Sequence, residues 1–168
     1  MPEDGLKLEY TRRDALQGLA VYGAGDTAAM LILGEFSLRR LLGVMLVGAT
    51  LYALEIPNYF KWIDNRVTTT HPVKRAALRT ALAMLYFNPL WIARHLAFLL
   101  IAEGSPDAVN RDLLGIGLQS WLAGIPATLV ANFIVQVKLP LKWRFFGSAL
   151  FSALMAIYYA LSKVIFNG

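Results

Sequence analysis

Long apolar stretches dominate this chain and determine the kind of solvent in which it can fold. Hydrophobic residues make up 57% of its 168 residues. An α-helix rises about 1.5 Å per residue, so a hydrocarbon core of about 30 Å requires roughly 20 apolar residues. Five stretches have this length: Asp14–Phe36, Leu38–Phe60, Arg79–Ala102, Leu113–Val137 and Trp143–Phe166. The sequence therefore predicts an all-α, polytopic transmembrane helical bundle with five spans; four spans are the alternative.

The connections between these stretches are too short to hold a separate soluble domain. We expect residues 1–13 to form a polar N-terminal leader and residues 14–168 to form one transmembrane helical bundle domain. The leader lacks the small-residue cleavage site of a signal peptide, which favours a retained first span. The chain contains no cysteine and two histidines, so we predict neither a disulfide nor a metal site.

The basic residues are distributed unevenly between the two sides of such a bundle. With five spans, the N-terminal side carries Lys7, Arg12, Arg13, Lys61, Arg66, Lys74, Arg75, Arg79, Lys138, Lys142 and Arg144. The opposite side carries only Arg39, Arg40, Arg111 and Lys163. Because cytoplasmic loops carry the excess of Lys and Arg, this asymmetry predicts that the N-terminus lies inside. The net charge of +5 then reflects membrane topology and contact with anionic lipid, and we do not expect nucleic acid as a partner.

Several ionisable or polar residues fall inside the apolar stretches, where each requires a partner or a watery cavity. They are Asp26, Glu55, Asn88, Arg94, His95 and Asn132. We treat these six as candidate pore-lining or buried polar residues. Helix rise places Asp26 and Arg94 at similar depths, which suggests a buried ion pair between them. Such a pair could be structural, or both residues could line a polar passage.

The third apolar stretch combines polar residues with a proline. Asn88, Trp91 and His95 are spaced to share one face of a helix. Pro89 removes a backbone hydrogen bond there and predicts a kink, as Pro57 and Pro126 do in the second and fourth stretches. Kinked helices around polar groups fit a cavity, and they fit irregular packing equally well.

Small residues recur every four positions in three of the stretches, a pattern that lets helices approach closely in lipid. The three stripes are Ala20, Ala24 and Ala28; Ala123, Ala127 and Ala131; and Ser148, Ser152, Ala156 and Ala160. In the fourth stretch, Thr128, Asn132 and Gln136 also repeat every four residues and form a polar stripe suited to hydrogen bonds between helices. These stripes predict a tightly packed bundle.

No catalytic motif is present: the chain has no Gly-rich phosphate loop, no HExxH and no G-x-S-x-G. We therefore predict neither an enzyme nor a bound cofactor, and no catalytic residue is proposed. Basic and aromatic residues near the ends of the apolar stretches are predicted to contact lipid at the membrane interface instead. These are Lys61, Trp62, Trp143 and Arg144.

Some of these residues follow an order that resembles the peroxisomal membrane protein family. That family includes peroxisomal pore-forming proteins and a mitochondrial inner-membrane protein linked to mitochondrial DNA depletion. The resemblance covers about residues 15 to 163. Its motifs are Gly23-Ala24-Gly25-Asp26, Tyr59-Phe60-Lys61-Trp62-Ile63-Asp64, Pro89, Arg111-Asp112, Pro126, Asn132-Phe133, Pro140, Arg144 and Tyr159-Ala160-Leu161-Ser162.

The resemblance implies a small helical membrane protein that forms a weakly selective channel or pore for small solutes. It marks Asp26, Asn132 and Arg144 as matching positions, with Arg144 as an anchor to lipid phosphate or to a helix end. A second possibility is an accessory subunit of a larger membrane complex of respiratory or photosynthetic type. The expected partners are the lipid bilayer, with anionic lipid on the basic face, and a homo-oligomer or larger membrane assembly. The expected location is a bacterial cytoplasmic membrane or a eukaryotic organelle membrane.

Overall fold

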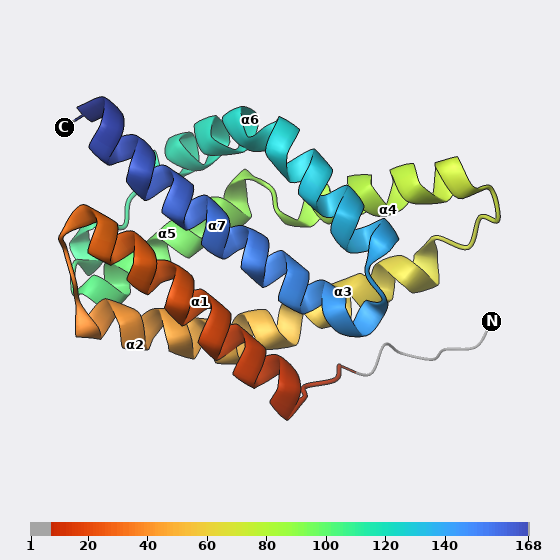
Figure 1. The fold of residues 1–168 in the computed structure, drawn as a ribbon, viewed down its shortest axis with the longest axis horizontal. Coiled ribbons are helices and arrows are strands. Elements are labelled where there is room, and N and C mark those ends of the chain that lie inside the picture. Colours follow the sequence, from red (N-terminus) through yellow and green to blue (C-terminus); the bar gives the residue numbers. More distant parts are fainter. Residues whose placement is uncertain (1–7, 168) are drawn as a thin grey trace.

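The computed structural model describes residues 8–167, and their side chains as far as residue 158. Every regular element in this part of the chain is helical, which confirms the all-α class (Figure 1). The α-helices are α1 (Arg12–Leu33), α2 (Leu38–Val47), α3 (Ala53–Arg66), α4 (Pro72–Tyr86), α5 (Pro89–Glu103), α6 (Asp112–Phe133) and α7 (Leu141–Asn167). Two π-helical segments, η1 (Gly48–Tyr52) and η3 (Ile134–Lys138), and a 3₁₀ turn, η2 (Pro106–Ala108), complete the order.

Local chemistry sets the ends of these helices. Thr11 and Ser37 accept hydrogen bonds from the backbone N–H of Asp14 and Arg40, which caps α1 and α2. The C-terminal ends of α1 and α5 are closed by Gly34 (φ 71°) and Gly104 (φ 91°), whose left-handed backbone suits glycine. The short turn between α1 and α2 folds these two helices back on one another.

Within the described part of the chain, three helical segments are long and apolar enough to cross a membrane. They are Arg12–Leu33, the continuous run Leu38–Arg66 and the run Asp112–Lys138. The pair α4 and α5 would make a fourth span if its two parts act together across a bend of 41°. The fifth predicted span corresponds to α7, whose last residues carry side chains outside the described part of the chain.

The proline positions have different outcomes. Pro89 begins α5 at the bend that follows α4, so the predicted break in the third stretch is present. Pro57 and Pro126 instead lie inside α3 and α6, and both helices continue through them. The π-helical turn η1 lies just before α3, the helix that contains Pro57. In η1, hydrogen bonds between residues i and i+5 replace the i to i+4 hydrogen bonds of an α-helix.

The long helices α1 and α7 pack side by side across one face of the bundle, with α2 and α3 in line beneath them (Figure 1). Glycines set the closest approaches of α1. A Cβ on Gly18 would meet the backbone of Gly48, and one on Gly25 would meet Ala153. The predicted alanine stripe is not the contact face, since Ala20 and Ala24 are exposed. Close packing in this bundle depends on glycine positions that the four-residue alanine pattern did not include.

A hydrophobic core lies between α3 and its neighbours. Ile56, Phe60 and Ile63 of α3 are fully buried, and Ala83 of α4 and Ala149 of α7 complete the contact. By contrast, α6 exposes large apolar side chains along most of its length. These include Leu114, Ile116, Leu118, Leu122, Leu129 and Val130. Such a surface is typical of a helix that faces lipid.

Candidate functional site

A pocket of about 460 Å³ lies between α1, α2, α5, α6 and α7. Of the six polar residues selected from the sequence, Asp26, His95 and Asn132 line it. The other three, Glu55, Asn88 and Arg94, do not line it. The volume is within the range of sites that hold small organic molecules.

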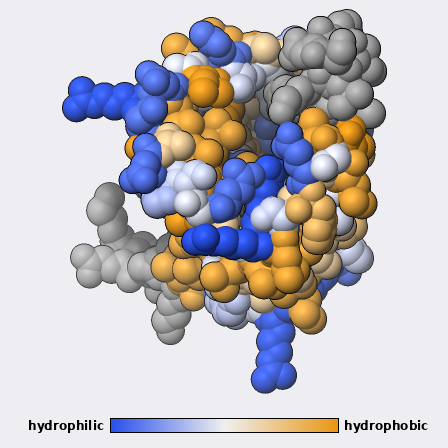
Figure 2. Space-filling model, turned by 90° about the vertical axis from the view of Figure 1, so that its left-hand side faces the viewer, coloured by the Kyte–Doolittle hydropathy of each residue, from blue (hydrophilic) through white to orange (hydrophobic). Residues whose placement is uncertain are grey.

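Asp26 does not pair with Arg94, so that prediction is wrong. Its carboxylate accepts three hydrogen bonds from Arg40 of α2, the shortest of 2.6 Å from Nη2. The same guanidinium donates from Nη1 to Glu103 of α5 at 2.6 Å. Arg40 thus joins α1, α2 and α5 at the end of the bundle where α1 turns into α2, where hydrophilic side chains gather among hydrophobic ones (Figure 2).

Arg94 pairs with Glu55 instead. Its two terminal nitrogens donate to the two carboxylate oxygens at 3.0 and 2.6 Å, and the Tyr86 hydroxyl donates to the same carboxylate at 2.9 Å. About a third of each charged side chain is exposed. The depth argument failed because it compared heights along the membrane normal and carried no information on which helices are neighbours.

The three residues predicted to share a face of the third stretch divide into two roles. Asn88 caps α5, since its side chain accepts the backbone N–H of Trp91 at 3.0 Å. Trp91 and His95 stack on each other with ring centroids 5.6 Å apart, and both line the pocket. The His95 Nδ1 lies 2.8 Å from the buried Tyr52 hydroxyl, which fixes the imidazole ring.

The polar stripe of α6 bonds within its own helix. The Thr128 hydroxyl donates to the carbonyl oxygen of Gly124, and the Asn132 amide donates to the carbonyl oxygen of Thr128. The predicted hydrogen bonds between helices are therefore not made by these two residues. Gln136 differs, since its side-chain oxygen accepts a long bond of 3.5 Å from Arg144 of α7.

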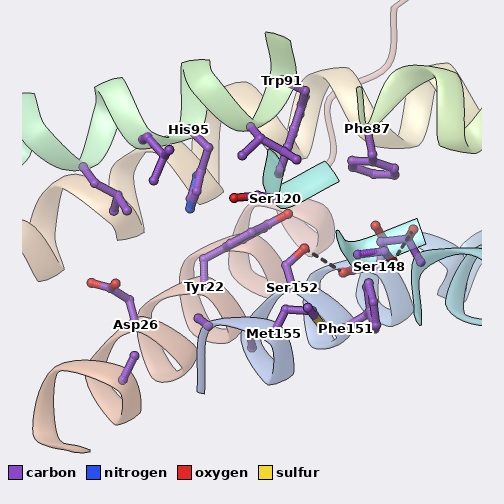
Figure 3. A pocket seen from close by; sticks show the side chains of 18 of the residues that line it. Tyr22, Asp26, Phe87, Trp91, His95, Ser120, Ser148, Phe151, Ser152 and Met155 are labelled. Carbon is purple, nitrogen blue, oxygen red and sulfur yellow. Dashed lines mark hydrogen bonds between the residues drawn. The ribbon is translucent and has the colours of Figure 1, made fainter. Parts of the chain in front are cut away.

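Sequence reasoning missed two buried polar groups that belong to residues lining the pocket. Tyr22 of α1 is 5% exposed, and Ser152 of α7 is the polar neighbour of its hydroxyl, but no hydrogen bond of good geometry is formed within the described residues. The indole Nε1 of Trp91 is also buried without a partner there. Figure 3 shows Tyr22 rising from α1 toward Trp91 and His95, which descend from α5, with Ser120 and Ser152 beside them. A tyrosine in an apolar stretch gives no sequence signal that its hydroxyl lacks a partner.

Of the four predicted interface residues, Arg144 is placed differently from the expectation. Its side chain is 6% exposed and donates to Asp64 at 2.7 Å and to the carbonyl oxygen of Leu139 at 3.1 Å. Arg79 also contacts this Asp64 carboxylate, at 3.0 Å. Arg144 therefore serves a buried ion pair and a helix end, and it is too enclosed to bind a lipid phosphate.

The other three interface residues lie closer to the surface. Lys61 donates to the Glu9 carboxylate at 2.6 Å, and Trp62 stacks against Tyr59. Trp143 is 43% exposed, and the Arg13 guanidinium lies 4.5 Å from the centre of its ring. These positions are compatible with the predicted contacts to the membrane interface.

Among the described residues, no three His, Asp or Glu side chains come close enough together to hold a metal ion. The polar groups of the pocket are suited to hydrogen bonding with an organic molecule instead. Comparison of the chain with protein-family models, with curated proteins and with solved structures finds no match.

Proposed function

We propose that this chain is an integral membrane protein that passes small uncharged solutes through the pocket in its helix bundle. The observation that carries the proposal is the 460 Å³ pocket itself, which is bounded by parts of three segments able to cross a membrane. Binding sites in helical bundles are commonly formed between helices in this way. The resemblance to the peroxisomal membrane protein family, with its pore-forming members, supports the same proposal.

The charges around the pocket favour an uncharged solute. Asp26 and Arg40 are the charged residues of its lining, and they neutralise each other through a bidentate contact. A charged solute would have to leave water without an opposite charge to receive it, which is costly in a low dielectric. We therefore expect neutral molecules to be favoured over ions of similar size.

The proposed topology has five spans, with α7 as the fifth and the N-terminus inside. Two facts support it: α7 packs along α1 for much of its length, and the basic residues collect on one side. The cysteine-free chain allows a direct test with Thr68→Cys and Ser105→Cys, both exposed in loops. In sealed vesicles, a membrane-impermeant thiol reagent should label these two positions from opposite sides. Labelling from the same side would refute the orientation.

Solute flux tests the function. Proteoliposomes should swell faster in glycerol than protein-free liposomes of the same lipid, as measured by stopped-flow light scattering. Ser120→Phe places a ring in the pocket and should slow this flux, whereas Leu122→Phe, on the exposed side of α6, should not. Equal swelling with and without protein would refute the proposal.

An accessory subunit of a larger membrane complex is the second candidate. It is favoured by the observation that the charges of Asp26, Glu55 and Arg94 are all used in contacts within the chain. Buried charges of this kind are compatible with a purely structural role. Native mass after extraction in mild detergent separates the two: a small homo-oligomer supports the channel, and fixed stoichiometry with other chains supports the subunit. In either case, we propose a bacterial cytoplasmic membrane or an organelle membrane as the location.

A further inference from the structure

The pocket is apolar over most of its wall, but two residues that line it from α1 and α5 carry hydrogen-bonding groups without a partner among the described residues. Leu33, Val44, Leu96, Leu99 and Ile116 contribute to the apolar lining. The unused groups are the Tyr22 hydroxyl and the Trp91 indole N–H. A buried donor without a partner is costly, and native proteins leave few of them. This combination resembles a ligand site, in which apolar walls bury a molecule and a few polar groups orient it.

The chemistry of these two groups restricts the ligand. An indole N–H can only donate, and a tyrosine hydroxyl can donate as well as accept. A molecule that satisfies both must therefore offer an acceptor oxygen between α1 and α5. Because Asp26 and Arg40 already neutralise each other, nothing in the lining calls for a charged group on the ligand.

Shape and size add to this restriction. The Trp91 and His95 rings stack within 7° of parallel on the α5 side of the pocket, and the Tyr22 ring faces them from α1 (Figure 3). An apolar cavity of about 150 Å³ accommodates benzene, so 460 Å³ has room for about three such rings.

We propose that the pocket binds a flat, uncharged, largely apolar molecule that carries a carbonyl oxygen, which accepts hydrogen bonds from Tyr22 and Trp91. The inference rests on the proposed function in one respect, since it takes the pocket as the chamber that a solute occupies. It goes further by naming the chemical class and the two residues that recognise it. Neither residue belongs to the polar positions selected from the sequence.

Two probes separate the carbonyl from the rest of the molecule. Fluorene and 9-fluorenone share the same flat three-ring skeleton and differ in the ketone oxygen. Binding is measured by isothermal titration calorimetry on the full chain in lipid nanodiscs, with empty nanodiscs of the same lipid as the blank. We expect fluorenone to bind about tenfold more tightly than fluorene, a difference of about 1.4 kcal/mol, which is the size of one net hydrogen bond.

Tyr22→Phe removes only the hydroxyl and should remove most of this preference. Because that hydroxyl forms no hydrogen bond of good geometry with the described residues, the variant should be at least as stable to heat as the wild type. Tyr59→Phe is the matched control. Its hydroxyl donates to the carbonyl oxygen of Leu82 away from the pocket, so it should lose stability but keep the preference for the ketone. Trp91→Phe tests the second donor in the same way.

Three outcomes would overturn the proposal. Equal affinity for the two probes would show an apolar cavity without recognition. An unchanged preference in Tyr22→Phe would mean that the oxygen is bound elsewhere. No saturable binding of either probe would indicate that the polar side holds only water.

The measurements of binding and of flux also test the ligand site and the channel independently of each other. Tyr22-dependent fluorenone binding without glycerol flux would refute the channel and support the ligand site. Glycerol flux without Tyr22-dependent fluorenone binding would support the channel and refute the ligand site. If Tyr22→Phe failed to fold, the two probes would be compared on the wild type and on the pocket-filling variant Ser120→Phe. The variant should bind neither probe, and binding by it would refute the pocket as the site.

Discussion

Helix α7 borders two regions of the bundle that are packed in different ways. Its N-terminal half belongs to a filled core, where Ala149 is fully buried next to Ile56 and Phe60 of α3. On another face of the same helix, Ser148, Ser152 and Ala156 border the 460 Å³ pocket. A single amphipathic pattern therefore contributes to a filled region and to a hollow one.

The two regions also differ in whether their buried polar groups have hydrogen-bonding or charged partners. In the filled region, Arg144 is enclosed and its charge is met by Asp64. At the pocket, Tyr22 and Trp91 keep polar atoms that form no hydrogen bond with side chains or backbone in the described part of the chain. Since apolar burial gives helices in lipid no net drive to associate, close contacts and polar pairs hold such a bundle together. We expect the filled region to contribute most of the stability by these means, and the pocket region to contribute less.

The largest effect is expected from Asp64→Asn in the filled region. This change leaves the enclosed Arg144 without its carboxylate and removes the partner of Arg79. Breaking a buried pair on one side costs about 3 kcal/mol or more. The measurement is reversible unfolding in mixed micelles, with Asp107→Asn in an exposed turn as the control. Equal, small losses in both variants would show that the filled region does not depend on this pair.

The contrast along α7 can be tested with one substitution made twice. Ala149→Leu inserts three carbons where no space exists and should destabilise the protein by about 1–3 kcal/mol. Ala156→Leu places the same atoms at the pocket wall and should change stability by no more than about 0.5 kcal/mol, or increase it. Both are measured by the same unfolding assay. If the two variants lose equal stability, the two regions are not packed differently.

The sequence predicted the helical class and most of the element positions, because apolar length and helix end signals are local properties. Thr11, Ser37 and Gly104 were not selected from the sequence, although each ends a helix through contacts within one turn. The number of membrane spans was harder to predict from the sequence. Whether α4 and α5 act as one span depends on a bend of 41° between them. Pro89 predicts a bend at this position, but the sequence does not give its angle.

The candidate site was predicted only in part. Asp26, His95 and Asn132 were selected because polar residues in apolar stretches are costly, and all three line the pocket. The pairing of Asp26 was missed since Arg40 lies near the end of a predicted span and its long side chain reaches inward. Glu103, which shares this guanidinium, lies just past the third stretch. Choosing partners requires knowledge of helix neighbours, which spacing along one helix does not contain.

A smaller effect is expected from a double-mutant cycle on the charges outside the pocket. Glu55→Gln and Arg94→Gln should couple by about 1 kcal/mol, because the two side chains share two hydrogen bonds. The cycle of Asp26→Asn with Arg94→Gln should couple by less than about 0.5 kcal/mol, because these residues share no partner. A strong coupling of Asp26 with Arg94 would support the ion pair predicted from the sequence. It would contradict the positions of these two residues on α1 and α5 in the structure.

The smallest effect is expected for Lys61→Gln at the surface of the filled region. Its pair with Glu9 has side chains 37% and 62% exposed, and such pairs contribute about 0.5 kcal/mol or less. The backbone of Glu9 is held independently by two hydrogen bonds to the Asn58 side chain, so the segment before α1 should stay in place. The loss should also shrink in high salt, because salt screens exposed charges. A loss as large as that of Asp64→Asn would mean that the filled region extends to this surface, whereas a negligible one would leave Lys61 the role of a basic residue that orients the helices in the membrane.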